Sequence, residues 1–193
     1  MNGKTHVAIG MAAALTISAG QPLERQLGII AAAAISSLIP DLDHPKGKLN
    51  QKILLFNNKF YRTLFYLSLG SVFMYLYFSQ GIKPFLLLGI TSFLIGVSTH
   101  RGFTHSILGF LISTFIVALG TVNYGLSSIY SGFIIGYVLH LIGDFFTPKG
   151  IKLFYPLNYK ISSPITIRTN SKLEEILVLV LSVYSICLLL RYY

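Results

Sequence analysis

Charged side chains are scarce in this chain of 193 residues: only 11% are Asp, Glu, Lys or Arg, whereas 53% are hydrophobic. An ordinary soluble domain carries about 25% charged residues. The mean hydropathy of +0.68 agrees with this imbalance. The lack of charge therefore excludes a typical soluble globular domain and indicates an integral membrane protein.

Cysteine is almost absent as well, since Cys187 is the single one and lies in an apolar run. A lone cysteine forms no internal disulfide and supplies no multi-cysteine zinc site, so both are excluded. The chain also lacks a Gly/Ser-rich or Pro-rich linker, and residues 1–193 are therefore expected to form one integral membrane domain. We expect the apolar opening stretch to be the first helix rather than a cleaved signal peptide, because its positively charged region is minimal.

Seven apolar runs predict an all-α, polytopic bundle of transmembrane helices. A helix that spans a membrane needs about 20 residues, with a range of about 17–25. Several runs are shorter than this, the second most of all, so the second could be re-entrant and the number of spans is about seven. The runs are Thr5–Ala19, Leu27–Pro40, Leu64–Ser79, Pro84–Thr99, Thr104–Thr121, Leu126–Gly143 and Ile176–Leu190.

Positive charges are distributed unevenly between the two sides of this bundle. Twelve of the fifteen Lys and Arg residues fall on the side of the N-terminus, namely Lys4, Lys46, Lys48, Lys52, Lys59, Arg62, Arg101, Lys149, Lys152, Lys160, Arg168 and Lys172. The other side holds Arg25, Lys83 and Arg191. Because cytoplasmic loops are enriched in Lys and Arg, the N-terminus is predicted to be cytoplasmic. The same rule explains the net charge of +9, and nucleic acid is not expected as a partner.

The five histidines and three aspartates fall into four clusters. These are His6; Asp41, Asp43 and His44 in "PDLDH"; His100 and His105 in "HRGFTHS"; and His140 and Asp144 in "LHLIGD". With the predicted topology, each cluster lies at the cytoplasmic end of its helix. Four segments that are distant in sequence are therefore predicted to meet at one membrane–water boundary.

The spacing within the clusters suits metal binding. His140 and Asp144 are four residues apart and therefore share one face of a helix. "PDLDH" places two carboxylates and an imidazole within four residues, a turn that could chelate one ion or bridge two. Imidazole and carboxylate together suit zinc, manganese or iron. Because ionisable groups beside a membrane mark functional sites, we predict a site for one or two divalent ions, with zinc as the first expectation.

Each cluster also has a purely structural interpretation. His6 could be an interface residue at a helix start, "PDLDHP" could be a turn, and the fourth cluster could be a pair bonded within its own helix. Arg101 could be a positive-inside anchor as well as a catalytic residue. Thr104 is expected to be the N-cap of the following helix. The predicted meeting of all four clusters favours a metal site over these separate interpretations.

Three motifs resemble those of the YdjM family of bacterial membrane-bound, metal-dependent hydrolases: "LIPDLDHPKG", "HRGFTHSILGF" and "GYVLHLIGDFFTPKGIKLFYP". Order and spacing match from residues 5–6 to residues 163–165, which is nearly the whole chain. The resemblance implies a metal-dependent hydrolase of the bacterial inner membrane, without supplying a substrate. The polar residues of the family motifs fall on His6, Asp41, Asp43, His44, His100, Arg101, Thr104, His105, Ser106, His140, Asp144, Thr147 and Pro148.

The leading hypothesis is a metal-dependent hydrolase that cleaves a phosphoester of a lipid or lipid-linked substrate at the cytoplasmic face of the membrane. The expected metal ligands are His6, Asp41, Asp43, His105, His140 and Asp144. The expected catalytic residues are His44, His100 and Arg101, with one of the two histidines as general acid or base. The expected substrate contacts are Arg101, Ser106, Lys46 and Lys149, which would attract an anionic group.

Two alternatives stay open. A zinc-dependent lipid amidase or esterase would need an oxyanion donor, which Ser106 or Arg101 could supply. The other alternative is a metal-binding or transport protein without turnover. Transport sites usually lie near the middle of the membrane, whereas the predicted clusters lie at helix ends. The segments Phe56–Tyr61 and Asn158–Lys172 are expected to lie along the membrane surface.

Overall fold

The computed structural model describes residues 1–192, which form eight α-helices and three short 3-10 segments. The helices are α1 (Gly3–Ser18), α2 (Leu23–Ser36), α3 (Asn50–Ile53), α4 (Lys59–Gln80), α5 (Lys83–Val97), α6 (Ile107–Thr121), α7 (Ser127–Phe145) and α8 (Lys172–Tyr192). The 3-10 segments are η1 (Pro40–Asp43), η2 (Phe103–His105) and η3 (Val122–Tyr124). No strand occurs in the described part of the chain, so the all-α prediction is confirmed there.

Each of the seven predicted apolar runs coincides with one of the long helices. Within the described residues, three helical segments are both long and apolar enough to cross a membrane: Leu23–Asp43, Ser127–Phe145 and Lys172–Arg191. The second run, expected to be the shortest, qualifies because α2 continues through a turn into η1. Helices α5 and α6 are apolar but shorter. The protein is thus a helical membrane protein, and the full count of seven spans stays a prediction.

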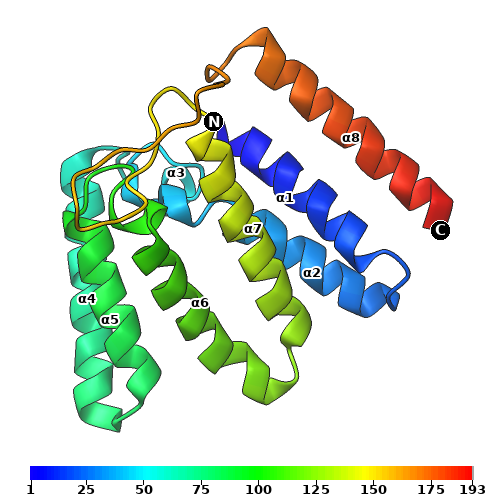
Figure 1. The fold of residues 1–193 in the computed structure, drawn as a ribbon. Coiled ribbons are helices and arrows are strands. Elements are labelled where there is room, and N and C mark those ends of the chain that lie inside the picture. The colour runs from blue at the N-terminus through cyan, green and yellow to red at the C-terminus, as the bar shows by residue number, and fades with distance from the viewer. Residues whose placement is uncertain (193) are drawn as a thin grey trace.

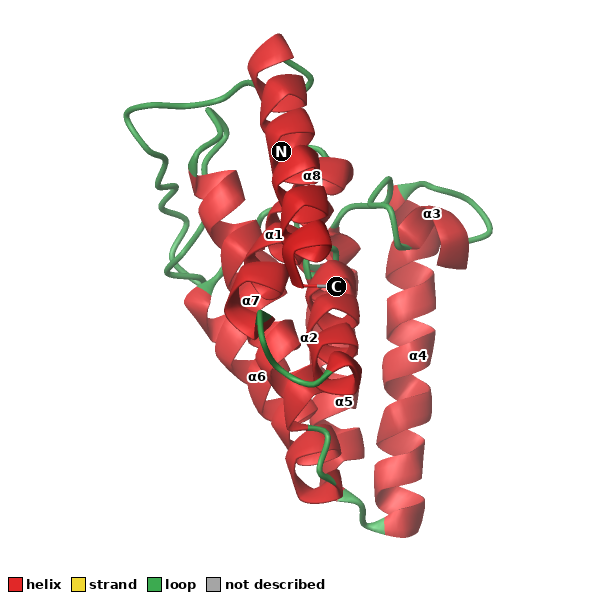
Figure 2. Ribbon diagram, turned by 90° about the vertical axis from the view of Figure 1, so that its right-hand side faces the viewer, coloured by secondary structure: helices red, strands yellow, loops and turns green. Residues whose placement is uncertain are grey.

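The helices are arranged as antiparallel pairs that spread from a common end (Figure 1). The pairs α1–α2, α4–α5 and α6–α7 each close at the far end by a short connection. Each connection contains a glycine with positive φ: Gly20 (78°), Gly81 (70°) and Gly125 (73°). Glycine adopts this conformation without the steric cost that a Cβ atom adds. At the common end lie the N-terminus and the longer connections, which contain η1, η2 and the segment between α7 and α8. Helix α8 lies on the outside, against α1 (Figure 2).

Helix α7 packs against α2 through a face of small residues. Gly132 and Gly136 lie four residues apart, and a Cβ atom at either position would be 2.2 Å from a backbone carbonyl oxygen of α2. Small residues allow this close approach. Membrane helices associate through such packing because the hydrophobic effect does not drive them together within the lipid bilayer. The same four-residue spacing continues along α7 to His140 and Asp144. The face that brings the two helices together is therefore also the face that carries the fourth His/Asp cluster.

The close contact between α2 and α7 can be tested with Gly136→Ala. A Cβ atom there would lie 2.2 Å from the carbonyl oxygen of Ala33 and 2.1 Å from the hydroxyl of Ser36, so the helices must separate. We expect the substitution to destabilise the protein by about 1–3 kcal/mol, measured as thermal unfolding in detergent. Gly120→Ala in α6 is the matched control, because nothing lies within 4 Å of its added Cβ atom. Equal shifts of the unfolding midpoint in the two variants would contradict the packing role of Gly136.

Candidate metal site

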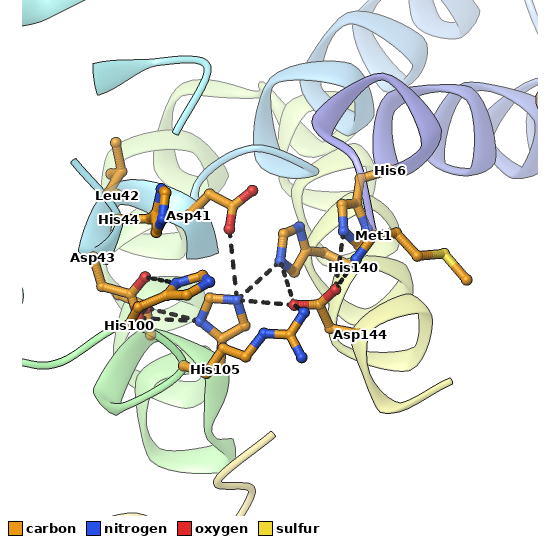
Figure 3. Close-up of polar contacts among 12 residues, drawn as sticks. Met1, His6, Asp41, Leu42, Asp43, His44, His100, His105, His140 and Asp144 are labelled. Atoms are coloured by element: carbon orange, nitrogen blue, oxygen red, sulfur yellow. Dashed lines mark hydrogen bonds and ion pairs between the residues drawn. The ribbon is translucent and has the colours of Figure 1, made fainter. Parts of the chain in front are cut away.

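The four His/Asp clusters meet at the common end of the bundle (Figure 3). They come from the start of α1, from η1, from the segment around η2 and from the end of α7. Among the described residues, two groups have ligating atoms that all lie within 4.8 Å of one another: Asp41, Asp43, His100 and His105 form one, and His6, His140 and Asp144 form the other. The two groups touch, because His105 Nε2 is 3.5 Å from Asp144 Oδ2. The four segments therefore meet as their positions at helix ends predict.

His105 lies at the centre of this arrangement and is fully buried. Its Nε2 atom is 3.1 Å from Nε2 of His140 and 3.5 Å from Oδ2 of Asp144. An oxygen of Asp41 lies 3.8 Å from the same nitrogen. Two ligands that bind one ion at about 2.0–2.2 Å are about 3 to 3.5 Å apart. His140 and Asp144 are thus spaced from His105 much like neighbouring ligands of a single ion, and Asp41 lies slightly farther from it.

The orientation of the His140 ring is set by a backbone carbonyl group. His140 Nδ1 lies 2.7 Å from the carbonyl oxygen of Ser37. Only an N–H can donate to this oxygen, so Nδ1 carries the proton and Nε2 presents its lone pair to the cluster. Ser37 is the C-cap residue of α2, where carbonyl groups have no partner within the helix. Histidines that bind metals almost always donate their other ring N–H in this way.

His6 is buried against the same cluster, with 1% of its surface exposed. Its ring stacks on that of His140 with the centroids 3.8 Å apart, and its Nε2 atom is 3.3 Å from Asp144 Oδ1. Neither ring nitrogen makes a hydrogen bond to a described residue, and Nδ1 also has no ion-pair contact there. Buried polar atoms without a partner are rare in native proteins. A bound cation would satisfy this imidazole, so the surroundings of His6 fit a metal site.

Asp43 has a different environment from the other predicted ligands. Its Oδ2 accepts the hydroxyl of Thr104 at 2.8 Å and lies 3.2 Å from His105 Nδ1. Its Oδ1 lies 2.9 Å from His100 Nδ1. The carboxylate is completely buried, and both oxygens are used to orient histidine rings. An outer carboxylate that holds a ligating imidazole in this way is typical of metal sites.

The charges around His105 favour a cation at this position. Burial alone would lower the pKa of its imidazole, but the carboxylates of Asp43 and Asp144 outweigh burial and raise the pKa to about 10. Asp144 also forms an ion pair with the α-amino group of Met1. The buried carboxylates of the site thus pair with positively charged groups of the protein.

Arg101 has a positive φ of 62° and a guanidinium group that is already engaged by the protein. Nη1 donates to the Thr147 hydroxyl and to the Gly150 carbonyl oxygen, both at 2.8 Å. Nη2 lies 2.8 Å from Asp144 Oδ2. With 7% of its surface exposed, Arg101 holds Asp144 in place and ties down the connection after α7. These contacts leave little of the guanidinium for the anion contact predicted from sequence.

The predicted N-cap at Thr104 is wrong. Ser106 is the N-cap residue of α6: its hydroxyl accepts the Gly109 N–H at 3.0 Å and donates to the Phe103 carbonyl oxygen at 2.6 Å. The short segment η2 precedes α6 and delays the helix start by two residues, which frees the Thr104 hydroxyl for Asp43. Ser106 is fully buried and is not among the residues that line the cleft over the site, so its predicted substrate contact has no structural support.

A cleft of about 740 Å³ opens over the cluster. Asp41, Arg101 and the predicted catalytic histidines His44 and His100 line it. Its other walls carry the cations Lys46, Lys48, Lys149 and Arg168. Lys46 and Lys149, which are predicted substrate contacts, thus line this cleft. Arg168 also lines it but was not predicted as a site residue, because it lies in none of the sequence motifs.

His44 and His100 lie side by side on the cleft wall, with ring centroids 4.4 Å apart. His44 Nδ1 accepts the backbone N–H of Lys46 at 3.2 Å, so a neutral His44 carries its proton on Nε2. Burial, together with the neighbouring His100, lowers the pKa of His44 below its usual value. His100 has the opposite arrangement, because Nδ1 donates to Asp43 and Nε2 keeps its lone pair. The two rings therefore offer the cleft one N–H donor and one nitrogen lone pair.

Arg62 and Asn50 hold the segment around η1 and were not expected to do so. The Arg62 guanidinium is buried and donates to the backbone carbonyl of Asp43, and to the carbonyl oxygens of Gly96 at 3.0 Å and Ser98 at 2.9 Å. It thereby satisfies carbonyl groups at the C-terminal end of α5. Asn50 donates to two carbonyl oxygens of the same segment at 2.9 and 2.8 Å. The distribution of Lys and Arg residues identifies Arg62 only as one more charge on the cytoplasmic side. The sequence therefore gives no indication that Arg62 binds these carbonyl groups.

The fold and the site define a helical membrane protein with a buried His/Asp cluster under a basic cleft at one end of its bundle. The model of the YdjM inner membrane protein family matches residues 1–193, and the chain belongs to this family. Together with the three span-length helices, this membership makes the chain a multi-pass protein of the inner membrane.

Two relatives show how far the similarity extends. The inner membrane protein YdjM of Escherichia coli (strain K12) is 25% identical over 161 residues, which cover 82% of this chain and 65% of the relative. The chain thus spans slightly less than two thirds of that protein's length. The protein YvsG of Bacillus subtilis (strain 168) is 28% identical over 176 residues, covering 91% of this chain and 86% of the relative. No solved structure matches the chain.

The role of Arg62 can be tested with Arg62→Met. The substitution removes donors to three backbone carbonyl groups, and hydrogen bonds to charged groups contribute about 1.5–3 kcal/mol each. We expect a loss of at least about 2 kcal/mol in the free energy of unfolding, measured by thermal or chemical unfolding in detergent. Lys59→Met, at an exposed position three residues earlier in α4, is the control and should leave stability nearly unchanged. Similar stability of the two variants would rule out a stabilising role for the hydrogen bonds of Arg62.

Proposed function

We propose that the protein is a membrane-embedded, metal-dependent hydrolase that cleaves a phosphoester of a lipid or lipid-linked substrate at the cytoplasmic face of the inner membrane. The observation that carries this proposal is the meeting of two imidazole nitrogens and two carboxylates beneath a basic cleft. Nε2 of His105 and Nε2 of His140 lie 3.1 Å apart there, beside Asp144. Neutral imidazole and carboxylate form the donor set expected for zinc, manganese or iron.

In this proposal the metal ligands are His105, His140, Asp144 and Asp41, with His6 as a further ligand. Asp43 acts instead as the carboxylate that orients His105, because its oxygens are used by the neighbouring donors. A divalent ion held there would supply Lewis-acid activation of water and of a phosphoryl oxygen at neutral pH.

The two cleft histidines are suited to different roles. His100 donates from Nδ1 to Asp43, which leaves Nε2 free to take a proton from water. His44 presents an Nε2–H that can donate a hydrogen bond to a substrate oxygen. Asp43 would also stabilise the imidazolium of His100 once it has accepted a proton. We therefore assign His100 as general base and His44 as a hydrogen-bond donor to the substrate.

The cytoplasmic position of the site is part of the proposal. All seven long helices would cross the membrane, with their common end in the cytoplasm, because the Lys- and Arg-rich connections lie at that end. Large apolar side chains are exposed beside these charges, with Leu55 89%, Phe56 56% and Phe60 70% exposed before and at the start of α4. Exposed aromatic residues among lysines are typical of a segment that touches the membrane interface.

The basic rim of the cleft favours a phosphorylated substrate over the alternatives. Lys46, Lys149 and Arg168 would attract a phosphate group. An amidase or esterase would need an oxyanion donor, but Ser106 is used as a helix cap and Arg101 is engaged by protein groups. A transport protein would be expected to hold its site near the middle of the membrane, whereas this cluster lies at helix ends and opens into the cleft.

The metal site predicts a clear order of metal retention among variants. His140→Ala and Asp144→Asn should lose bound metal after detergent purification, because each removes a direct ligand. Asp43→Asn should still bind, with affinity lowered by about 10–100-fold, as is usual for an outer carboxylate. Elemental analysis of the purified proteins measures this, with Glu175→Gln at an exposed position of α8 as the control. Full metal occupancy in both ligand variants would overturn the site.

The acid–base assignment predicts a separate effect on turnover. With panels of phospholipids and polyprenyl phosphates, His100→Ala should lower kcat by about 10²–10⁴-fold while bound metal is retained. Lys83→Ala, at the far end of the bundle, should leave kcat unchanged. The products distinguish the classes: release of phosphate or a phosphoalcohol supports the proposal, whereas release of fatty acid identifies an amidase or esterase. Metal-loaded protein without turnover on either panel would contradict hydrolysis of these lipids.

A further inference from the structure

A second groove adjoins the cleft on the outer side of α1. It has a volume of about 400 Å³ and lies between the start of α1, the end of α2 and the segment before and within α3. Its apolar lining consists of Val7, Leu38 and Leu49, and three lysines, Lys4, Lys48 and Lys52, surround this lining. The volume falls within the range of about 300–1,000 Å³ that is usual for ligand pockets.

The three lysines form a concentration of unpaired positive charge. All three are exposed, and none is within ion-pair distance of a carboxylate among the described residues. No acidic residue lines the groove. The stem of Lys48 packs against Gly3, where an added Cβ atom would lie 2.8 Å from Lys48 Cγ. Lysine stems that cover apolar surface while their ammonium groups stay in water are typical of a membrane interface.

The apolar lining of the groove continues along the outside of the α1–α2 pair. On α1, Met11 follows Val7 by one helical turn and is 36% exposed. On α2, Ile35 precedes Leu38 by one turn and is 58% exposed. Residues one turn apart share a helix face. A strip of apolar side chains thus leads from the lysines along two helices that are packed against each other.

We propose that this groove binds an anionic phospholipid, with its phosphate held by Lys4, Lys48 and Lys52 and its acyl chains along the strip on α1 and α2. The combination of unpaired cations and an adjoining apolar strip matches a ligand that has an anionic head and hydrocarbon chains. Gly3 and Lys48 line both this groove and the cleft, so the lipid head lies next to the candidate metal site. The inference goes beyond the proposed hydrolysis and does not depend on it.

Fluorescence quenching tests the proposal directly, because the chain contains no tryptophan. Leu49→Trp places a single indole in the groove. The protein is reconstituted in bilayers of phosphatidylglycerol and phosphatidylcholine of constant composition, in which one lipid or the other carries brominated chains. Brominated phosphatidylglycerol should quench the indole more than its share of the bilayer explains. The preference should fall by about fivefold for each lysine replaced by alanine and should weaken at high salt.

Two controls separate specific binding from general contact with lipid. Leu179→Trp, at an exposed position of α8, should be quenched equally by both lipids. Val7→Trp reports from the opposite wall of the groove and replaces Leu49→Trp if that variant does not fold. Equal quenching by the two lipids at the groove, or a preference that survives replacement of all three lysines, would overturn the proposal. Metal content is measured in parallel and should not change, so this result is independent of the hydrolase assignment.

Discussion

The close contact between α2 and α7 is the constraint on which the rest of the structure depends. Gly132 and Gly136 remove side-chain volume from α7, and its backbone therefore reaches the backbone of α2. At this separation the C-terminal end of α2 lies beside His140, and the carbonyl of Ser37 accepts the proton of that imidazole. Packing of small residues thus decides the orientation of a ring in the His/Asp cluster.

Burial of charge explains most of the remaining contacts at this end of the bundle. A carboxylate or guanidinium that is removed from water must find partners, because leaving it unpaired costs several kcal/mol. Asp43 is surrounded by donors from the segment around η2, and Arg62 by carbonyl oxygens of η1 and of the end of α5. The hydrogen bonds of these two side chains hold η1, the segment around η2 and the end of α5 together, in a region where helix packing alone would not fix the chain. The cluster is therefore held in place by contacts from several elements, while the cleft above it is lined by charged side chains.

Much of the architecture could be predicted from the pattern of apolar runs, since each run became a helix and the four clusters met at one end. That success rests on two simple features: the length of the apolar runs, and the alternation of successive helix ends between the two sides of a bundle. Prediction failed where a contact depended on the exact path of the chain. Thr104 and Ser106 illustrate this, because a short 3-10 segment moved the helix start by two residues and exchanged their roles.

The amino-acid sequence alone determined that this is a helical membrane protein and which residues supply its ionisable groups, because hydropathy and residue type are properties of the chain itself. Only the tertiary structure decided what those groups do. It assigned Asp43 to orient histidines rather than to face the centre of the cluster, enclosed Arg101 and Arg62 in hydrogen bonds, and brought Arg168 to the cleft. These differences arise because a hydrogen bond extends over only about 3 Å, and distances of that size depend on how the helices pack.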